Sequence, residues 1–95
     1  MKTDLEQIKA KAIPILRNAG VTRSALFGSY VRGESTSDSD IDILVDLPRG
    51  KSLFDLADLQ MKLEEALGKE IDVVTYNSLH PLLKDRILGE QVQIL

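Results

Sequence analysis

Two short polar motifs lie close together in the first half of the chain, and their residue types suit phosphate and metal chemistry. The first is Gly28-Ser29, and the second, after ten intervening residues, is Asp40-Ile41-Asp42. Residues i and i+2 of a strand project to the same face, so the carboxylates of Asp40 and Asp42 are expected to lie side by side. Carboxylates held this close repel each other, and a divalent cation such as Mg²⁺ between them removes the repulsion.

A third acid follows in the segment EIDVVTY, residues 70–76. If this segment is a strand beside the one that carries Asp42, the carboxylate of Asp72 meets the first pair on one side of the sheet. Three carboxylates suit a two-metal site for phosphoryl or nucleotidyl transfer, in which ions about 3.5 to 4 Å apart hold the attacking and leaving oxygens. An isolated D-x-D pattern is common, however, and the alternative is that these acids only solubilise strand ends.

The glycine-serine turn supplies the groups that a phosphate would contact. Gly28 lets the backbone approach a ligand closely, Ser29 adds a hydroxyl, and exposed N–H groups at the start of a short helix favour phosphate. Arg32, one turn further on, adds a charge-assisted contact. Alone, such a turn is equally well explained as an ordinary loop, so its meaning depends on the acids that follow.

The segments around these motifs predict an α/β (α+β) fold, with a small mixed sheet of about four strands flanked by helices. Apolar residues at helical spacing, with capping and stop signals, predict helices over residues 3–20, 52–67 and 81–88. Pro14 predicts a kink or break near Ala12 and Ile13, and Gly89 predicts the end of the last helix. Alternating and β-branched residues predict strands over residues 21–27, 41–47 and 70–76, with the tail 90–95 as an edge strand.

Composition limits the classes of function. A chain of 95 residues with 43% apolar content predicts one domain over residues 1–95. A net charge of −3 argues against non-specific nucleic-acid binding, which needs a basic face. The absence of cysteine excludes disulfides and thiolate metal sites, and no apolar run approaches the length of a membrane span. The expected location is the cytoplasm.

In combination, the motifs resemble the signature of the DNA polymerase β-like nucleotidyltransferase superfamily: a hydrophobic residue, Gly, Ser, a spacer, then two acids separated by an apolar residue. Arg32-Gly33 and Ser39-Asp40-Ile41-Asp42 match the variant found in minimal nucleotidyltransferases, the MntA-type antitoxins that pair with HEPN toxins. The resemblance covers nearly the whole chain and includes Asp72.

This resemblance implies a role for each motif residue. Gly28 and Ser29 would hold the nucleotide triphosphate, Asp40 and Asp42 would bind two Mg²⁺ ions, and Asp72 would bind the ion that activates the acceptor hydroxyl. Members of the superfamily transfer a nucleoside monophosphate to a hydroxyl and release pyrophosphate. MntA-type members are similar to protein adenylyltransferases, so the implied reaction moves AMP from ATP to a tyrosine of a HEPN ribonuclease toxin.

The small size of the chain also predicts a protein partner in a hetero-oligomer, because no second domain is available to bind an acceptor. Exposed apolar residues would serve this contact, and the candidates are Phe54, Met61, Leu82, Leu83 and Ile87. Of these, Phe54 is more expected to complete the core. Two alternatives stay open: a non-catalytic binding module that neutralises its partner by occlusion, and nucleotidyl transfer to a small molecule or an RNA end.

Overall fold

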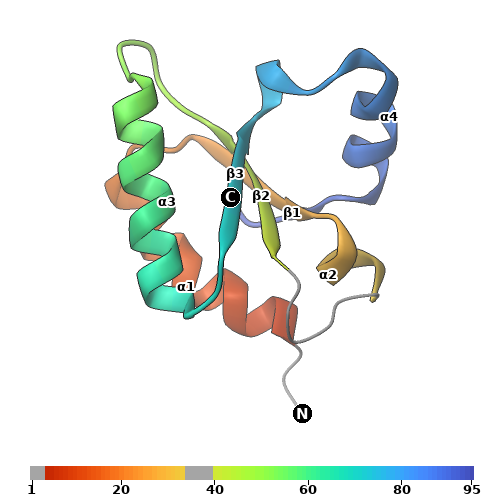
Figure 1. The fold of residues 1–95 in the computed structure, drawn as a ribbon, viewed down its shortest axis with the longest axis horizontal. Coiled ribbons are helices and arrows are strands. Elements are labelled where there is room, and N and C mark those ends of the chain that lie inside the picture. The colour runs from red at the N-terminus through yellow and green to blue at the C-terminus, as the bar shows by residue number, and fades with distance from the viewer. Residues whose placement is uncertain (1–3, 34–39) are drawn as a thin grey trace.

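A mixed four-stranded sheet separates two layers of helices in the computed structural model, which describes residues 4–33 and 40–95 (Figure 1). The elements are α1 (Asp4–Asn18), β1 (Arg23–Phe27), α2 (Ser29–Arg32), β2 (Ile41–Asp46), α3 (Leu53–Leu67), β3 (Ile71–Thr75), a 3-10 turn (Tyr76–Ser78), α4 (Pro81–Glu90) and β4 (Val92–Gln93). The predicted fold class is therefore confirmed. The predicted polar tract between the two motifs falls on residues 34–39, outside the described residues.

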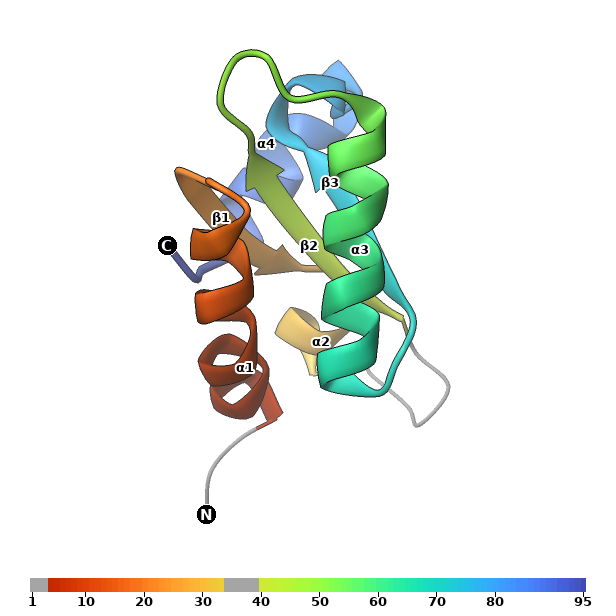
Figure 2. The same cartoon turned by 90° about the vertical axis from the view of Figure 1, so that its left-hand side faces the viewer.

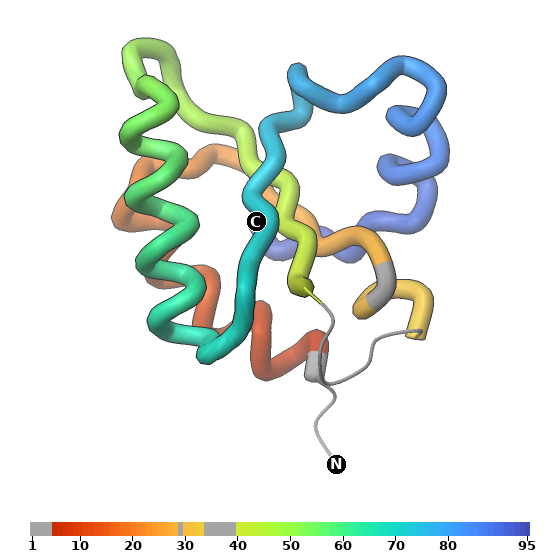
Figure 3. The backbone as a smooth tube through the Cα atoms, in the orientation of Figure 1, coloured from red at the N-terminus to blue at the C-terminus, as the bar shows by residue number. Residues whose placement is uncertain are grey.

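The strand order β3-β2-β1-β4 places the two acid-bearing strands side by side, as the backbone tube in Figure 3 shows. β2 runs antiparallel to β1, with Phe27 opposite Asp42. β2 and β3 run parallel, with Asp42 opposite Asp72. A parallel pair needs a crossover connection, which α3 provides here.

One face of the sheet forms the core. α1 and α3 lie together on that face (Figure 2), where their apolar side chains pack on the inward residues of β2. The inward residues of β2 are Ile41, Ile43 and Val45, all of them buried. Because side chains alternate along a strand, the intervening residues of β2 point to the opposite face, on the side where α4 lies (Figure 1). The packing that buries the isoleucines therefore also turns Asp42 away from α1 and α3, toward the side of the sheet where α4 lies.

Local sequence signals set most element boundaries. The predicted capping box at the start of α3 is confirmed: the N–H of Phe54 donates to Ser52 Oγ (3.2 Å), and the N–H of Ser52 donates to Asp55 Oδ2 (2.8 Å). Gly68 ends the helix in the left-handed region, at φ 69°. These signals fix where α3 begins and ends, and hence where β3 starts.

α1 continues through Pro14, so of the predicted kink or break the break does not occur. Pro14 and Ala10, one turn earlier, are both exposed, which leaves the Ala10 carbonyl open to water. Two boundaries near the end of the chain differ from the prediction. α4 continues through Gly89 to Glu90, since Gly89 keeps a negative φ and Glu90 is held by an ion pair. The predicted edge strand shrinks accordingly to Val92–Gln93.

Several large apolar side chains are exposed. Phe54 is 87% exposed, so the expectation that it completes the core is wrong: it lies in the first turn of α3, where Leu59 and Leu63 further along the helix take the buried positions. Met61 and Leu82 are also exposed, at 66% and 85%. In the described part of the chain, no helix is long and apolar enough to cross a membrane.

Candidate active site

The acids at the centre of the candidate site come from two neighbouring strands. Asp42 and Asp72 are register partners in the parallel pair of β2 and β3, so their side chains leave the same face of the sheet. Asp40 lies immediately before β2 and is exposed, as is Asp72, while Asp42 is half-buried. The sequence argument depended on these two strands being neighbours, and the structure shows that they are, so that three carboxylates lie at one end of the sheet.

The electrostatics of Asp42 reflect this crowding. Burial raises its pKa from 3.8 to about 6, with further upward contributions from the charges of Asp72 and Asp40 and an opposing one from Arg32. Its carboxylate therefore holds a charge that the protein alone compensates poorly.

The carboxylates are suited to a hard divalent cation, although they do not yet enclose one. Within residues 4–33 and 40–95, no three carboxylate or imidazole groups are close enough to form a complete metal-binding cluster. The chemistry of the donors fits Mg²⁺ all the same, since they are carboxylate oxygens whose crowding is costly without a cation.

Gly28 lies directly against the Asp42 side chain. Its φ of +84° is in the left-handed region, and a Cβ built on it would lie 3.1 Å from Cγ of Asp42 and closer still to Oδ2. The carbonyl of Gly28 accepts hydrogen bonds from the N–H groups of Val31 and Arg32, both at 3.1 Å. A glycine is thus required twice here, for backbone conformation and for the approach of the carboxylate.

The remaining predicted phosphate ligands follow in α2. Ser29 is the first residue of this helix, and its side chain lies outside the described part of the structure. Arg32 Nη1 forms an ion pair with Glu90 Oε1 of α4 at 3.1 Å. The sequence reasoning missed Glu90, and no local pattern links it to a residue 58 positions earlier.

A cavity of about 220 Å³ adjoins the glycine turn, between α2 and α4. Its lining residues are Phe27, Gly28, Arg32, Leu83, Arg86, Ile87 and Glu90. Residues of α4 therefore line the same cavity as Gly28 and Arg32, two of the predicted phosphate ligands. The sequence had suggested α4 only as a surface for binding a partner. The acids, the glycine turn and this cavity form one continuous candidate site.

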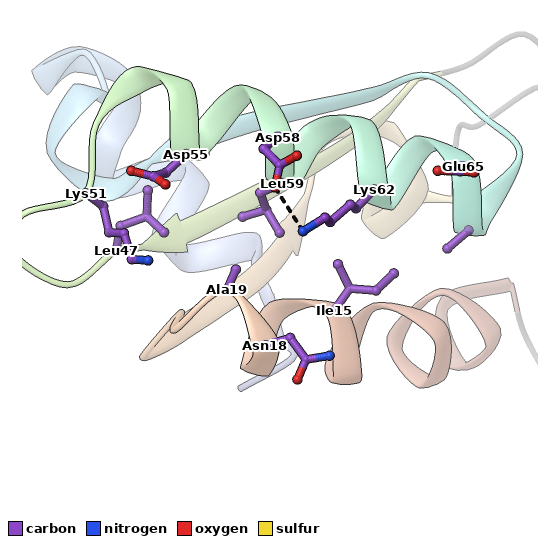
Figure 4. A pocket seen from close by; sticks show the side chains of 11 residues that line it. Ile15, Asn18, Ala19, Leu47, Lys51, Asp55, Asp58, Leu59, Lys62 and Glu65 are labelled. Atoms are coloured by element: carbon purple, nitrogen blue, oxygen red, sulfur yellow. Dashed lines mark ion pairs between the residues drawn. The ribbon is translucent and has the colours of Figure 1, made fainter.

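A larger groove, of about 510 Å³, lies between α1 and α3 (Figure 4). Its floor includes Ile15 and Leu59, and its rim carries three acids and two lysines, one of which pairs with Asp58 (Lys62 Nζ to Oδ2, 2.9 Å). The buried layer of the sheet separates this groove from Asp42. This groove is therefore not part of the candidate site, although it is larger than the cavity beside Gly28.

The crowding at Asp42 leads to a titration prediction. Without metal, the carboxyl carbon of Asp42 should titrate near pH 6, and Mg²⁺ should lower this pKa because the cation favours the ionised form. Carbon-detected NMR titration of the chain, with EDTA and then with excess Mg²⁺, measures both values. Asp46, at the far end of the same strand, serves as the internal control and should respond little to Mg²⁺. If the pKa of Asp42 were the same with and without Mg²⁺, the assignment of Asp42 as a metal ligand would be contradicted.

The comparisons with known proteins cover almost the whole chain. The model of the nucleotidyltransferase domain family matches residues 9–93. A proposed protein adenylyltransferase of Methanocaldococcus jannaschii is 60% identical over 92 residues, which is 97% of this chain and 99% of that protein. The protein adenylyltransferase MntA of Thermococcus cleftensis is 43% identical over 75 residues, covering 79% of this chain and 76% of that one.

Solved structures agree in fold. A minimal nucleotidyltransferase superposes with a TM-score of 0.83 at 34% identity, covering 97% of this chain and 95% of its own. A toxin-antitoxin structure with AMP-PNP gives a TM-score of 0.80 at 29% identity, over 92% of this chain and 72% of that one. An MNT antitoxin in complex with a tri-AMPylated HEPN toxin of Shewanella oneidensis gives 0.73 at 26% identity, over 95% and 71%.

Proposed function

The chain belongs to the nucleotidyltransferase domain family, within its minimal members, and from this membership we propose that it is an antitoxin that transfers AMP from ATP to a HEPN-type toxin. The observation that carries the proposal is the parallel register of Asp42 and Asp72, with Gly28 against the Asp42 carboxylate. One domain, residues 1–95, holds all of these groups.

Each residue of the site has a distinct role in this proposal. Asp40, Asp42 and Asp72 would hold two Mg²⁺ ions, which would supply charge neutralisation at the phosphates and a lowered pKa for the acceptor hydroxyl. Gly28 and Ser29 contact the triphosphate, and Arg32 faces it from the next turn. Gly28 suits this role because its lack of a side chain leaves room for the Asp42 carboxylate beside the turn.

The reaction places an acceptor hydroxyl in line with the α-phosphorus of ATP. A bond forms between the hydroxyl oxygen and this phosphorus, the bond to the bridging oxygen of the β-phosphate breaks, and pyrophosphate leaves. The hydroxyl proton passes to a carboxylate, for which we propose Asp72, because it is the exposed acid beside Asp42. A tyrosine of the toxin is the acceptor in this proposal.

The nucleotide and partner assignments are supported by the relatives. A 29% identical structural neighbour was solved with AMP-PNP, and a 26% identical one is an antitoxin bound to a tri-AMPylated HEPN toxin. Exposed apolar residues on α3 and α4, such as Phe54 and Leu82, offer surface for a hetero-oligomeric contact. The cytoplasm, where ATP is abundant, is the compartment that this reaction requires.

The test is to incubate the purified chain with ATP, Mg²⁺ and the protein encoded beside it, and then to measure the mass of that protein. We expect its mass to increase in steps of one AMP. The matched control replaces both Asp40 and Asp42 with Asn, which preserves side-chain shape and removes the two charges. Peptide mapping of the adduct then identifies the modified residue.

Three outcomes would contradict parts of the proposal. The absence of an AMP adduct, or an adduct that survives the double substitution, would contradict transfer by these acids. Full neutralisation of the partner by the doubly substituted chain at equal stoichiometry would favour occlusion. AMP transfer to RNA ends or small molecules in the absence of the partner would favour a different acceptor.

A further inference from the structure

The cavity beside the glycine turn has an arginine on each of two facing elements. Arg32 projects from α2, and Arg86 belongs to α4. Arg86 shares one side of α4 with Leu83, Ile87 and Glu90, which follow at the spacing of successive helical turns and also line the cavity. Two arginines that are far apart in sequence therefore line a single cavity.

The two arginines differ in how the protein uses them. Arg32 is paired with Glu90 at 3.1 Å, which fixes α4 to the end of α2. Arg86 makes no hydrogen bond or ion pair with the described part of the chain, and its side chain is not needed for the core because the residue is exposed. Folding therefore gives no reason for an arginine at this position.

We propose that Arg86 is a second phosphate-binding residue, and that the cavity between α2 and α4 receives the β- and γ-phosphates of the nucleotide, the part that leaves as pyrophosphate. This inference rests on the proposed function. Gly28, at the mouth of the cavity, lies against Asp42, so the α-phosphate would lie at the acids while the two outer phosphates extend toward α4.

The charges and surroundings of the cavity suit this ligand. Among the described residues that line the cavity, Arg32 and Arg86 each carry a positive charge and Glu90 a negative one, so the lining has a net positive charge that suits a polyanion. Phe27, Leu83 and Ile87 line the same cavity, so the two arginines are the cationic groups of its lining and Glu90 is the acid. A guanidinium also contacts phosphate oxygens through two N–H groups, which a lysine cannot reproduce.

The inference is tested by binding measurements that need no acceptor. Calorimetry with Mg²⁺ compares inorganic tripolyphosphate, a non-hydrolysable ATP analogue and AMP on the wild-type chain and three variants, Arg86→Ala, Arg86→Lys and Lys84→Ala. Lys84 is the matched control, because it is an exposed cation on α4 that does not line the cavity. Thermal midpoints verify that each variant remains folded.

In Arg86→Ala, loss of the guanidinium should lower the affinity for tripolyphosphate and for the ATP analogue by about 10- to 100-fold, as expected for a hydrogen-bonded ionic contact. The affinity of Arg86→Ala for AMP should change by less than about threefold. The affinity of Lys84→Ala for every ligand should change as little, since surface substitutions away from a contact have small effects. Arg86→Lys should fall between the wild type and Arg86→Ala.

Three results would overturn the inference. Arg86→Ala could bind tripolyphosphate as tightly as the wild type does, or it could lose as much affinity for AMP as for tripolyphosphate. The wild-type chain could also bind AMP but not tripolyphosphate. Its failure is distinguishable from failure of the proposed function, because the partner's AMP adduct is a separate measurement. An unchanged affinity with intact AMP transfer would contradict only the role of Arg86. A lost affinity in a chain that never modifies its partner would contradict only the proposed reaction.

Discussion

Asp42→Asn is expected to abolish AMP transfer and, at the same time, to raise the stability of the metal-free protein. Asparagine keeps the shape of the side chain but removes the negative charge that would hold Mg²⁺ at the phosphates. Metal ions supply several kcal/mol of transition-state stabilisation, so the loss in rate should be on the order of 10³ or more. The adduct assay with the partner measures this loss directly.

The gain in stability follows from the pKa of the same residue. Its pKa in the folded chain, about 6, lies above the unfolded value of 3.8, so the folded state binds the proton more tightly. The free energy of unfolding therefore falls as pH rises from about 4 to about 6, and the deficit is complete above that window. Asparagine never ionises, so Asp42→Asn removes the deficit at neutral pH and changes little near pH 4.

Thermal unfolding in EDTA measures this effect, at about pH 7.5 and again near pH 4, on either side of the window in which Asp42 ionises. The matched control is Asp46→Asn, because Asp46 is an exposed acid on the same face of β2. It should not reproduce the pH-dependent increase in the thermal midpoint. A thermal midpoint of Asp42→Asn that falls at neutral pH, or that rises equally at both pH values, would contradict this account. It would show that ionisation of the Asp42 carboxyl group does not destabilise the metal-free protein.

Much of the site could be predicted from the sequence because its geometry depends on local rules. The two-residue period of a strand placed Asp42 away from the buried isoleucines, and the capping box together with Gly68 fixed the helix that joins the two acid-bearing strands. Neither rule fixes which strands pair. The register of Asp42 with Asp72 depends on how α3 packs against the sheet, which only the folded chain shows.

The contribution of α4 could not be predicted, because it depends on contacts between distant segments. Arg32 and Glu90 are 58 residues apart, and Arg86 belongs to a helix whose sequence shows no phosphate motif. The exposure of Phe54 was missed for a related reason. Helical spacing placed Phe54 on a flank of the apolar stripe of α3, but the buried residues of this helix are Leu59 and Leu63, and the ring in the first turn is 87% exposed.

Gly28→Ala is expected to lower both stability and AMP transfer, although alanine adds a single methyl group. The left-handed backbone, at φ +84°, costs a residue with a side chain about 1 to 2 kcal/mol. The new Cβ must also displace the Asp42 carboxylate, which lies against it. For a domain of this size each kcal/mol lowers the thermal midpoint by roughly 4 to 8 °C, and displacement of Asp42 should reduce transfer nearly as much as Asp42→Asn does.

Gly50→Ala separates the two costs. Gly50 has a similar backbone conformation, φ +91°, but a Cβ added there meets nothing within 4 Å. This control should lower the thermal midpoint through the backbone alone and should leave AMP transfer unchanged. The difference between the two variants therefore measures the contact with Asp42.

A double-mutant cycle then identifies the contact itself. In an Asp42→Ala background the obstructing carboxylate is gone, and only the Asp42 Cβ remains, at 3.4 Å from the new methyl group, which is an ordinary contact. The stability cost of Gly28→Ala should then fall to that of Gly50→Ala, which would make the two substitutions non-additive. If the cost instead stays the same in both backgrounds, the glycine is required for its backbone conformation alone, and the close approach of turn and acid is not what fixes Asp42 in place.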